Sequence, residues 1–232
     1  MKFSNISAVL SDIEGTTSSV NFVYEVLFPY FRNKLSQLPE MTAQAQVQAA
    51  FKRTVELSSE MEGKTIKSID DILATLYRWS VEDKKITPLK TLQGILWKEG
   101  YASGELEGHV YDDVAPALKK WYDSKLTLNV FSSGSVDAQK LIFRNSVAGD
   151  LSKYFSSFYD TETGGKRECG TYRKIAASMN FPCENILFLS DVIEELQAAE
   201  DAGMQTLQLV RNGTVPPWKN RVKSFSEIDI DQ

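Results

Sequence analysis

At 232 residues the chain is long for one compact core and short for two full domains, so we expect a main domain with a sizeable insertion. A formal net charge of -5, without a stripe of lysine and arginine, excludes a surface built to bind nucleic acid or an anionic membrane. No apolar run reaches the ~20 residues of a membrane span, and the N-terminus lacks the long apolar core of a signal peptide, so we expect a cytoplasmic protein.

The first strand is expected at residues 7–11, where a short apolar run stops. Residues 22–104 then show helical patterns and no convincing strand. Pro29 should kink or divide the first helix, Ser68 begins a capping box, and the helix that starts at Thr87-Pro88 should end before Gly100. A helical insert of roughly eighty residues is therefore expected to interrupt the core directly after its first strand.

The second half of the chain alternates between strand and helix patterns. Strands are expected at 126–131, 186–189 and 206–210, and helices at 136–144, 172–179 and 193–202. This alternation indicates an α/β core with a parallel sheet whose strands are covered on both faces. The last dozen residues are too irregular to assign.

Polar side chains follow three of these strands. The first strand leads to Asp12 and Glu14, the second to Ser-Ser-Gly-Ser at 132–135, and the third to Asp191. Lys166 lies in a glycine loop before the helix that leads to the third strand. Ligands of open parallel sheets bind beyond the carboxyl ends of the strands, so we expect these groups to share one site.

The residue types suit phosphate transfer. Asp12 and Asp191 can supply oxygen ligands for Mg²⁺, which keeps waters and a substrate phosphate as its other ligands. Either Ser132 or Ser133 can donate its hydroxyl to a phosphate oxygen, beside the backbone amides around Gly134.

The transfer itself needs a nucleophile, a cation and a proton donor. A carboxylate oxygen of Asp12 would attack phosphorus and form an aspartyl-phosphate, with Lys166, or its neighbour Arg167, neutralising charge. Glu14 would protonate the leaving oxygen and later activate water.

Four motifs carry a resemblance to a known family: "SDIEGTT", "VFSSGS", "GGKRE" and "LFLSD" occur in the order typical of the haloacid dehalogenase superfamily. Longer stretches such as "LFPYFRNKL" and "LKTLQGILWKEGYASGEL" are similar to the enolase-phosphatases of methionine salvage, also called acireductone synthases. The resemblance implies a Rossmann-like α/β core at residues 1–18 and 106–232 and an α-helical cap of the C1 type at 19–105.

The resemblance also implies a reaction. The family converts 2,3-diketo-5-methylthiopentyl-1-phosphate, by enolisation and dephosphorylation, to 1,2-dihydroxy-3-keto-5-methylthiopentene. It implies one Mg²⁺ per subunit at Asp12, Glu14 and Asp191, with Glu14 contributing either its side chain or its backbone carbonyl, and a monomeric enzyme. Glu14 stands where most phosphatases of the superfamily carry aspartate, and its extra methylene extends the carboxylate by about 1.3 Å.

Several residues keep more than one interpretation. Glu194 and Glu195 can be first-turn helix acids or can support the metal. His109, the single histidine, is expected to be structural, and Cys169 and Cys183 are expected to be reduced thiols. The base for enolisation is open between Glu14, a cap residue and water.

Three other functions remain as alternatives. A phosphatase acting on another small phosphate ester would not need a glutamate at position 14. A phospho-acceptor signalling module would use Asp12 but would not need the long helical insert. A binding protein derived from an enzyme would be expected to have lost one of the four site residues, Asp12, Glu14, Lys166 and Asp191, and all four are present.

Overall fold

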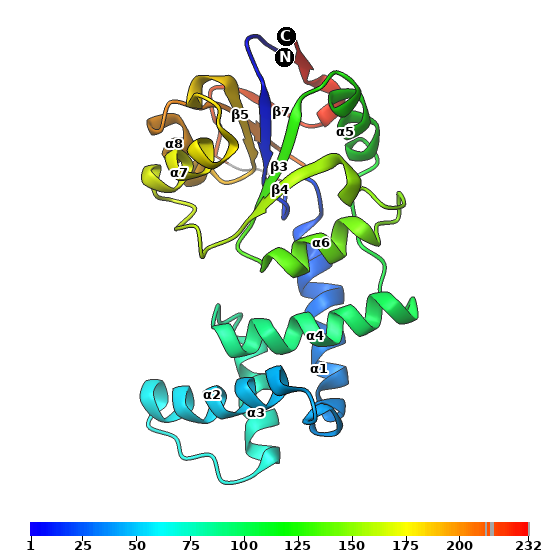
Figure 1. The fold of residues 1–232 in the computed structure, drawn as a ribbon, viewed down its shortest axis with the longest axis vertical. Helices are drawn as coiled ribbons and strands as arrows, with labels where there is room; N and C mark the ends of the chain where they lie inside the picture. Colours follow the sequence, from blue (N-terminus) through cyan, green and yellow to red (C-terminus); the bar gives the residue numbers. More distant parts are fainter. Residues whose placement is uncertain (212, 214–215, 232) are drawn as a thin grey trace. The chain divides into compact units, whose positions relative to one another are not determined.

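The computed structural model describes residues 1–211, 213 and 216–231, and these form two compact units (Figure 1). One unit consists of Met1–Val20 with Glu107–Gln232, and the other of Asn21–Leu106. We call the first the core unit and the second the helical unit. In the described part of the chain no helix is both long enough and apolar enough to cross a lipid bilayer.

The core unit alternates strands and helices along most of its length. Its elements are β1 (Lys2–Phe3), β2 (Ala8–Ser11), α5 (Val114–Asp123), β3 (Thr127–Phe131), α6 (Val136–Arg144), β4 (Phe155–Tyr159), α7 (Cys169–Met179), β5 (Ile186–Ser190), α8 (Ile193–Asp201), β6 (Gln205–Leu209), β7 (Arg221–Val222) and β8 (Asp229–Ile230). The four predicted strands and three predicted helices are all present.

The main sheet is parallel, with the strand order β4-β3-β2-β5-β6-β7. The first strand of this sheet in the chain, β2, therefore lies inside it, and Leu10 pairs with Asn129 of β3 on one side and with Phe188 of β5 on the other. The chain runs outward from β2 to β3 and β4, and then returns to β5 on its other side. This reversal makes the carboxyl end of β2 the switch point at which an α/β sheet binds ligands.

Successive side chains along a strand point to opposite faces of the sheet, so the core unit has two separate hydrophobic cores. Val9 packs in a cluster that includes Trp121 of α5 and Phe143 of α6, on one face of the sheet. On the other face Leu10 packs with side chains of α7 and α8. These two helices lie together on one side of the sheet in Figure 1. Because both faces are covered, β2 reads as a continuous apolar run rather than an alternating one.

The sequence did not predict four strands of the core unit. β4 (Phe155–Tyr159) is only partly buried and lies at an edge of the sheet, so its apolar signal is weak. The other edge is β7, which has two residues. β1 and β8 form a separate two-stranded parallel ladder in which Lys2 pairs with Asp229, and this ladder places the two ends of the chain together (Figure 1).

The helical unit contains no strand. It begins with a π-helix (Phe22–Leu27) and continues through α1 (Phe28–Lys34), a 3₁₀ segment (Leu35–Met41), α2 (Ala45–Glu62), α3 (Ile69–Val81) and α4 (Thr87–Ser103). Pro29 occupies the first turn of α1, so the predicted division of the first helix falls just before it.

Two helix boundaries test the sequence reading of this unit. The capping box at Ser68 is confirmed, because Ser68 and Asp71 exchange side-chain-to-backbone hydrogen bonds at the start of α3. The expected end of α4 before Gly100 is wrong, since the helix continues to Ser103 and ends at Gly104, whose φ is +77°. A Cβ on Gly100 would lie 2.7 Å from the Tyr30 ring, so that glycine is required for packing and not for ending the helix.

Candidate active site at the carboxyl end of the central strand

Asp12 directly follows β2, at the switch point of the sheet. Its backbone N–H donates to the Leu189 carbonyl at 2.9 Å, and its Oδ1 accepts from the backbone N–H of Ile13 at 2.8 Å. The side chain is 4% exposed, so the carboxylate is buried as well as held by the Ile13 N–H. Gly15, two residues beyond Ile13, has φ +75° and turns the chain.

Lys166 reaches the same carboxylate from the loop before α7. Its Nζ lies 2.6 Å from Asp12 Oδ1 and 2.8 Å from Glu195 Oε2. The Tyr172 hydroxyl donates to the Lys166 carbonyl at 2.6 Å, which fixes the backbone of the lysine. The neighbouring Arg167 is exposed, so of the two predicted cations Lys166 is the one directed at Asp12.

The serine loop after β3 meets Glu14. The Ser132 hydroxyl donates to Glu14 Oε2 at 3.0 Å, and its oxygen accepts from the Gly134 backbone N–H at 3.1 Å. Ser132 is fully buried, whereas Ser133 is partly exposed. Of the two serines, Ser132 is the one whose hydroxyl the structure places between Glu14 and the backbone amide.

Asp191 follows β5 and lies against the turn at Gly15. A Cβ on Gly15 would be 2.2 Å from Asp191 Oδ2, so only glycine leaves room for this carboxylate. Its other oxygen, Oδ1, is buried and has no hydrogen-bond partner among the residues that the structure describes. A buried carboxylate oxygen without a donor is costly unless a ligand or cation neutralises it.

Ser190 and Glu195 complete the site. The sequence gave Ser190 no role and left Glu195 open between a first-turn helix acid and support of the metal. The Ser190 hydroxyl lies 3.0 Å from Glu195 Oε2 and 3.3 Å from Asp12 Oδ2. Glu194 is exposed and Glu195 is buried, so only Glu195 takes part in the site. Glu195 comes four residues after Asp191 at the start of a helix, and this spacing was the sequence signal that could have placed both side chains in one site.

The electrostatics show an excess of negative charge. Burial, and then the charge of Asp12, raise the pKa of Asp191 to about 6 and that of Glu195 to about 8. The same two causes raise the pKa of Glu14. Lys166 also has a raised pKa: burial opposes its charge, but Asp12 and Glu195 outweigh that effect. Four carboxyl groups thus surround one ammonium group, an arrangement that a bound cation would relieve.

These residues fit a divalent cation. Asp191 Oδ1 is a buried acceptor without a donor, and hard oxygen ligands are those that Mg²⁺ prefers. Among the residues that the structure describes, no three His, Cys, Asp or Glu side chains are placed to hold a metal together. The carboxylates of Asp12 and Asp191 would therefore supply two ligands of the ion, and a backbone oxygen, water and substrate would complete its coordination shell.

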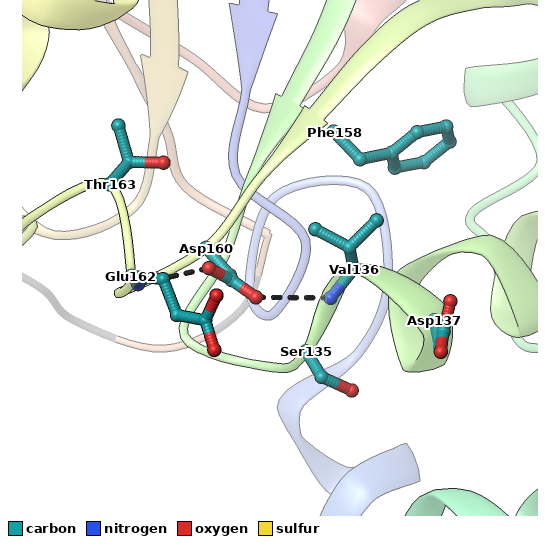
Figure 2. Close-up of a pocket in the computed structure, with 7 residues that line it drawn as sticks. All are labelled: Ser135, Val136, Asp137, Phe158, Asp160, Glu162 and Thr163. Carbon is teal, nitrogen blue, oxygen red and sulfur yellow. Dashed lines mark hydrogen bonds between the residues drawn. The ribbon is translucent and has the colours of Figure 1, made fainter.

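A pocket of about 500 Å³ lies next to the serine loop, between the start of α6 and the segment after β4 (Figure 2). Asp160 lines this pocket, and its carboxylate accepts from the backbone N–H groups of Val136 and Glu162. Both oxygens of this carboxylate are used to cap the start of α6 and the turn after β4, so we assign the pocket no part in phosphate transfer.

Comparison with known proteins fixes the family. The model of the haloacid dehalogenase-like hydrolases matches residues 6–203. An enolase-phosphatase E1 from Picosynechococcus sp. is 47% identical over 224 residues, which cover 96% of this chain and 98% of that relative. Another, from Pseudomonas aeruginosa strain LESB58, is 46% identical and covers 97% of this chain and 99% of its own. The chain belongs to the enolase-phosphatase E1 family of haloacid dehalogenase-like hydrolases. It is a hydrolase of the phosphatase type.

Solved structures support the fold of this family. The UTR4 protein of Saccharomyces cerevisiae is 32% identical, with a TM-score of 0.78, over 94% of this chain and 98% of that one. CbbY from Rhodobacter sphaeroides, solved in complex with phosphate, has a TM-score of 0.60 at 17% identity and shows the shared fold alone. The predicted resemblance and fold class are thus confirmed, while the roles of the individual site residues stay predictions.

Proposed function

We propose that this chain converts 2,3-diketo-5-methylthiopentyl-1-phosphate to 1,2-dihydroxy-3-keto-5-methylthiopentene and phosphate, as an enolase-phosphatase of methionine salvage. One observation carries the proposal: Asp12 and Glu14, two residues apart on the turn after β2, face different partners. Asp12 contacts Lys166, and Glu14 contacts Ser132. A nucleophile and a proton carrier are thereby held separately, which phosphate ester hydrolysis requires.

Asp12 and Asp191 would hold a Mg²⁺ ion, one per subunit, and the backbone oxygen of Glu14 is the third protein ligand that we favour. When bound, the ion would act as a Lewis acid on the substrate oxygens and would screen the phosphate from the carboxylates. The orphaned Oδ1 of Asp191 and the excess of carboxylates support this assignment.

In phosphate transfer, a carboxylate oxygen of Asp12 attacks phosphorus while the bond from phosphorus to the substrate oxygen breaks. Glu14 gives its proton to that leaving oxygen. Lys166 and the Ser132 hydroxyl stabilise the charge on the transferring group. A water then attacks the aspartyl-phosphate and gives a proton to Glu14, which restores both carboxyl groups and releases phosphate.

Enolisation requires a proton to leave the carbon next to a carbonyl group. We assign this step to Glu14, with a residue of the helical unit as the alternative base. Burial and the nearby Asp12 raise the pKa of Glu14, so its carboxylate is a stronger base than an exposed glutamate. Such a group suits a site that must both accept and donate protons.

The helical unit is proposed as the cap. The chain leaves the core unit at Val20, shortly after the turn that carries Glu14, and returns to it at Glu107. An insert at that point can exclude water while the enol forms. We further propose that the enzyme acts as a monomer in the cytoplasm on this small phosphorylated diketone.

The test follows the diketone phosphate by ultraviolet absorbance and by phosphate release in the same sample, with Mg²⁺ and then with a chelator. The proposal predicts an enol that precedes free phosphate, with both signals dependent on Mg²⁺. Hydrolysis of phenyl phosphate without any enol from the diketone would instead show a capped phosphatase with another substrate.

A further inference from the structure

The turn that carries Glu14 is held by a set of backbone contacts. Within residues 13–18, which we call the Glu14 loop, the Ile13 carbonyl accepts from the N–H groups of Thr16, Thr17 and Ser18. The Gly15 N–H donates to the Ser18 carbonyl at 2.8 Å. These bonds define the shape of the loop, but they do not attach it to the rest of the core unit.

Arg211, just after β6, makes one of the attachments. Its Nε donates to the Thr16 carbonyl at 2.8 Å, and the Thr16 residue is fully buried. Nearby, the Tyr111 backbone N–H donates to the Thr17 carbonyl at 3.0 Å. The carbonyl of Thr16 is thus held by a side chain, and that of Thr17 by the backbone.

The Arg211 guanidinium is itself held through its Nε and Nη1 atoms and by two aromatic rings, while its buried Nη2 has no hydrogen-bond partner among the described residues. Its Nη1 donates to both carboxylate oxygens of Asp113, at 2.9 and 2.7 Å, and the Arg211 side chain is only 7% exposed. The Tyr111 ring lies 4.3 Å and the Phe225 ring 5.0 Å from its central carbon. Asp113 in turn accepts from the Ser224 hydroxyl at 2.8 Å. Because the guanidinium is planar and its Nη1 is held by Asp113, the Nε–H is directed at the Thr16 carbonyl.

We propose that Arg211 is a positioning residue for catalysis, which acts by anchoring the Glu14 loop through the Thr16 carbonyl. The inference rests on the proposed function in one respect, the role of Glu14 in proton transfer. Without the anchor, Thr16 can shift, and Glu14, two residues earlier, loses its 3.0 Å contact with Ser132. Arg211 contacts neither Glu14 nor Ser132 in any described hydrogen bond, so its effect must pass through the loop.

Two substitutions test the anchor. Arg211→Met removes the guanidinium, and Arg211→Lys keeps the charge without the planar group whose Nε and Nη1 reach Thr16 and Asp113 together. For both variants we expect the kcat for phosphate release to fall about 10- to 100-fold while KM changes by less than about 3-fold, because misplacement of a catalytic group by about 1 Å has this effect. Arg173→Met is the matched control, since Arg173 also donates to a backbone carbonyl, that of Asp201, but on the exposed side of α7. It should leave kcat unchanged.

A double-mutant cycle with Glu14→Gln separates positioning from a general loss of folded protein. If Arg211 acts through Glu14, Arg211→Met should cost less than about 3-fold in the Glu14→Gln background, because the group that it positions is already disabled. An equal loss in both backgrounds, or no loss in the single variant, would overturn the proposal. If Arg211→Met does not fold, the same cycle is run with Arg211→Lys.

The use of two substrates keeps the test of Arg211 independent of the test of the proposed function. Every rate is measured on the diketone phosphate and on phenyl phosphate, whose leaving oxygen also takes up a proton. If the wild-type protein never turns over the diketone, the proposed substrate is wrong, but the coupling between Arg211 and Glu14 is still measured on phenyl phosphate. If the diketone is turned over and the coupling is absent, only the positioning proposal fails.

Discussion

Replacing Glu14 with aspartate tests how far the carboxylate must reach. In the structure Glu14 Oε2 lies 3.0 Å from the Ser132 hydroxyl. Aspartate is shorter by about 1.3 Å, so the same contact would open to about 4.3 Å, beyond hydrogen-bonding distance. A misplacement of that size costs about 100-fold in rate, or about 2.7 kcal/mol in the activation free energy.

The assay records enol formation and phosphate release for the wild type, Glu14→Asp and Glu14→Gln. We expect Glu14→Asp to lower the kcat for both signals by about 100-fold at nearly unchanged KM. Glu14→Gln keeps the reach but cannot carry a proton, and its phosphate release should fall by about 10²- to 10⁴-fold. A Glu14→Asp enzyme within about 3-fold of the wild type in both steps would refute the reasoning from side-chain length.

Three further outcomes are expected. Gly15→Ala forces a Cβ to within 2.2 Å of Asp191 Oδ2, so the Mg²⁺ concentration for half-maximal activity should rise by about 10-fold or more. Gly134→Ala is the control and should bind Mg²⁺ normally, because its Cβ would meet only the Ser132 hydroxyl, at 3.7 Å. Glu195→Gln removes the ionisable carboxyl group 2.8 Å from Lys166 Nζ. Above about pH 8, where that carboxyl is charged in the wild type, the ammonium of the variant is paired with Asp12 alone, and kcat should fall by about 10-fold without a change of fold, as near-ultraviolet circular dichroism can check. In the helical unit, hydrogen bonds from Arg78 and then Lys84 lower the pKa of Glu62 below its ordinary value of 4.5, so their stabilisation is present above pH 4.5 and is lost as the pH falls. Glu62→Gln should therefore reduce the free energy of unfolding by about 2 kcal/mol at pH 7 and flatten its decrease below pH 4.5, which urea unfolding at a series of pH values can measure.

Much of the core unit could be predicted because its central strands are buried on both faces. The residues of β2 and β5 form apolar runs that each end at an acid, Asp12 and Asp191, and the parallel topology brings those ends together. Edge strands lack this signal. β4 has exposed or partly exposed positions throughout, and β7 is too short to show any pattern.

The parts of the site that the sequence missed depend on contacts between distant segments. Glu195 was left open between a helix acid and support of the metal, and its contact with Lys166 forms only when the Lys166 loop is folded beside it. Arg211 and Asp113 are 98 residues apart, and the sequence analysis gave neither residue a role. Gly100 was misread for a related reason, because only the folded helical unit shows that its missing side chain makes room for Tyr30.

His109 gives the core unit a property that concerns its evolution. The Ser19 N–H donates to His109 Nδ1 at 3.1 Å, so the segment that leaves the core unit and the segment that re-enters it are joined before the insert begins. The insert is therefore a long loop between two neighbouring points of a core that is already closed, and the entropy of closing such a loop grows only slowly with its length. Inserts of very different size can be exchanged at this point at little cost to the core, which gives one catalytic sheet access to new substrates without rebuilding its active site.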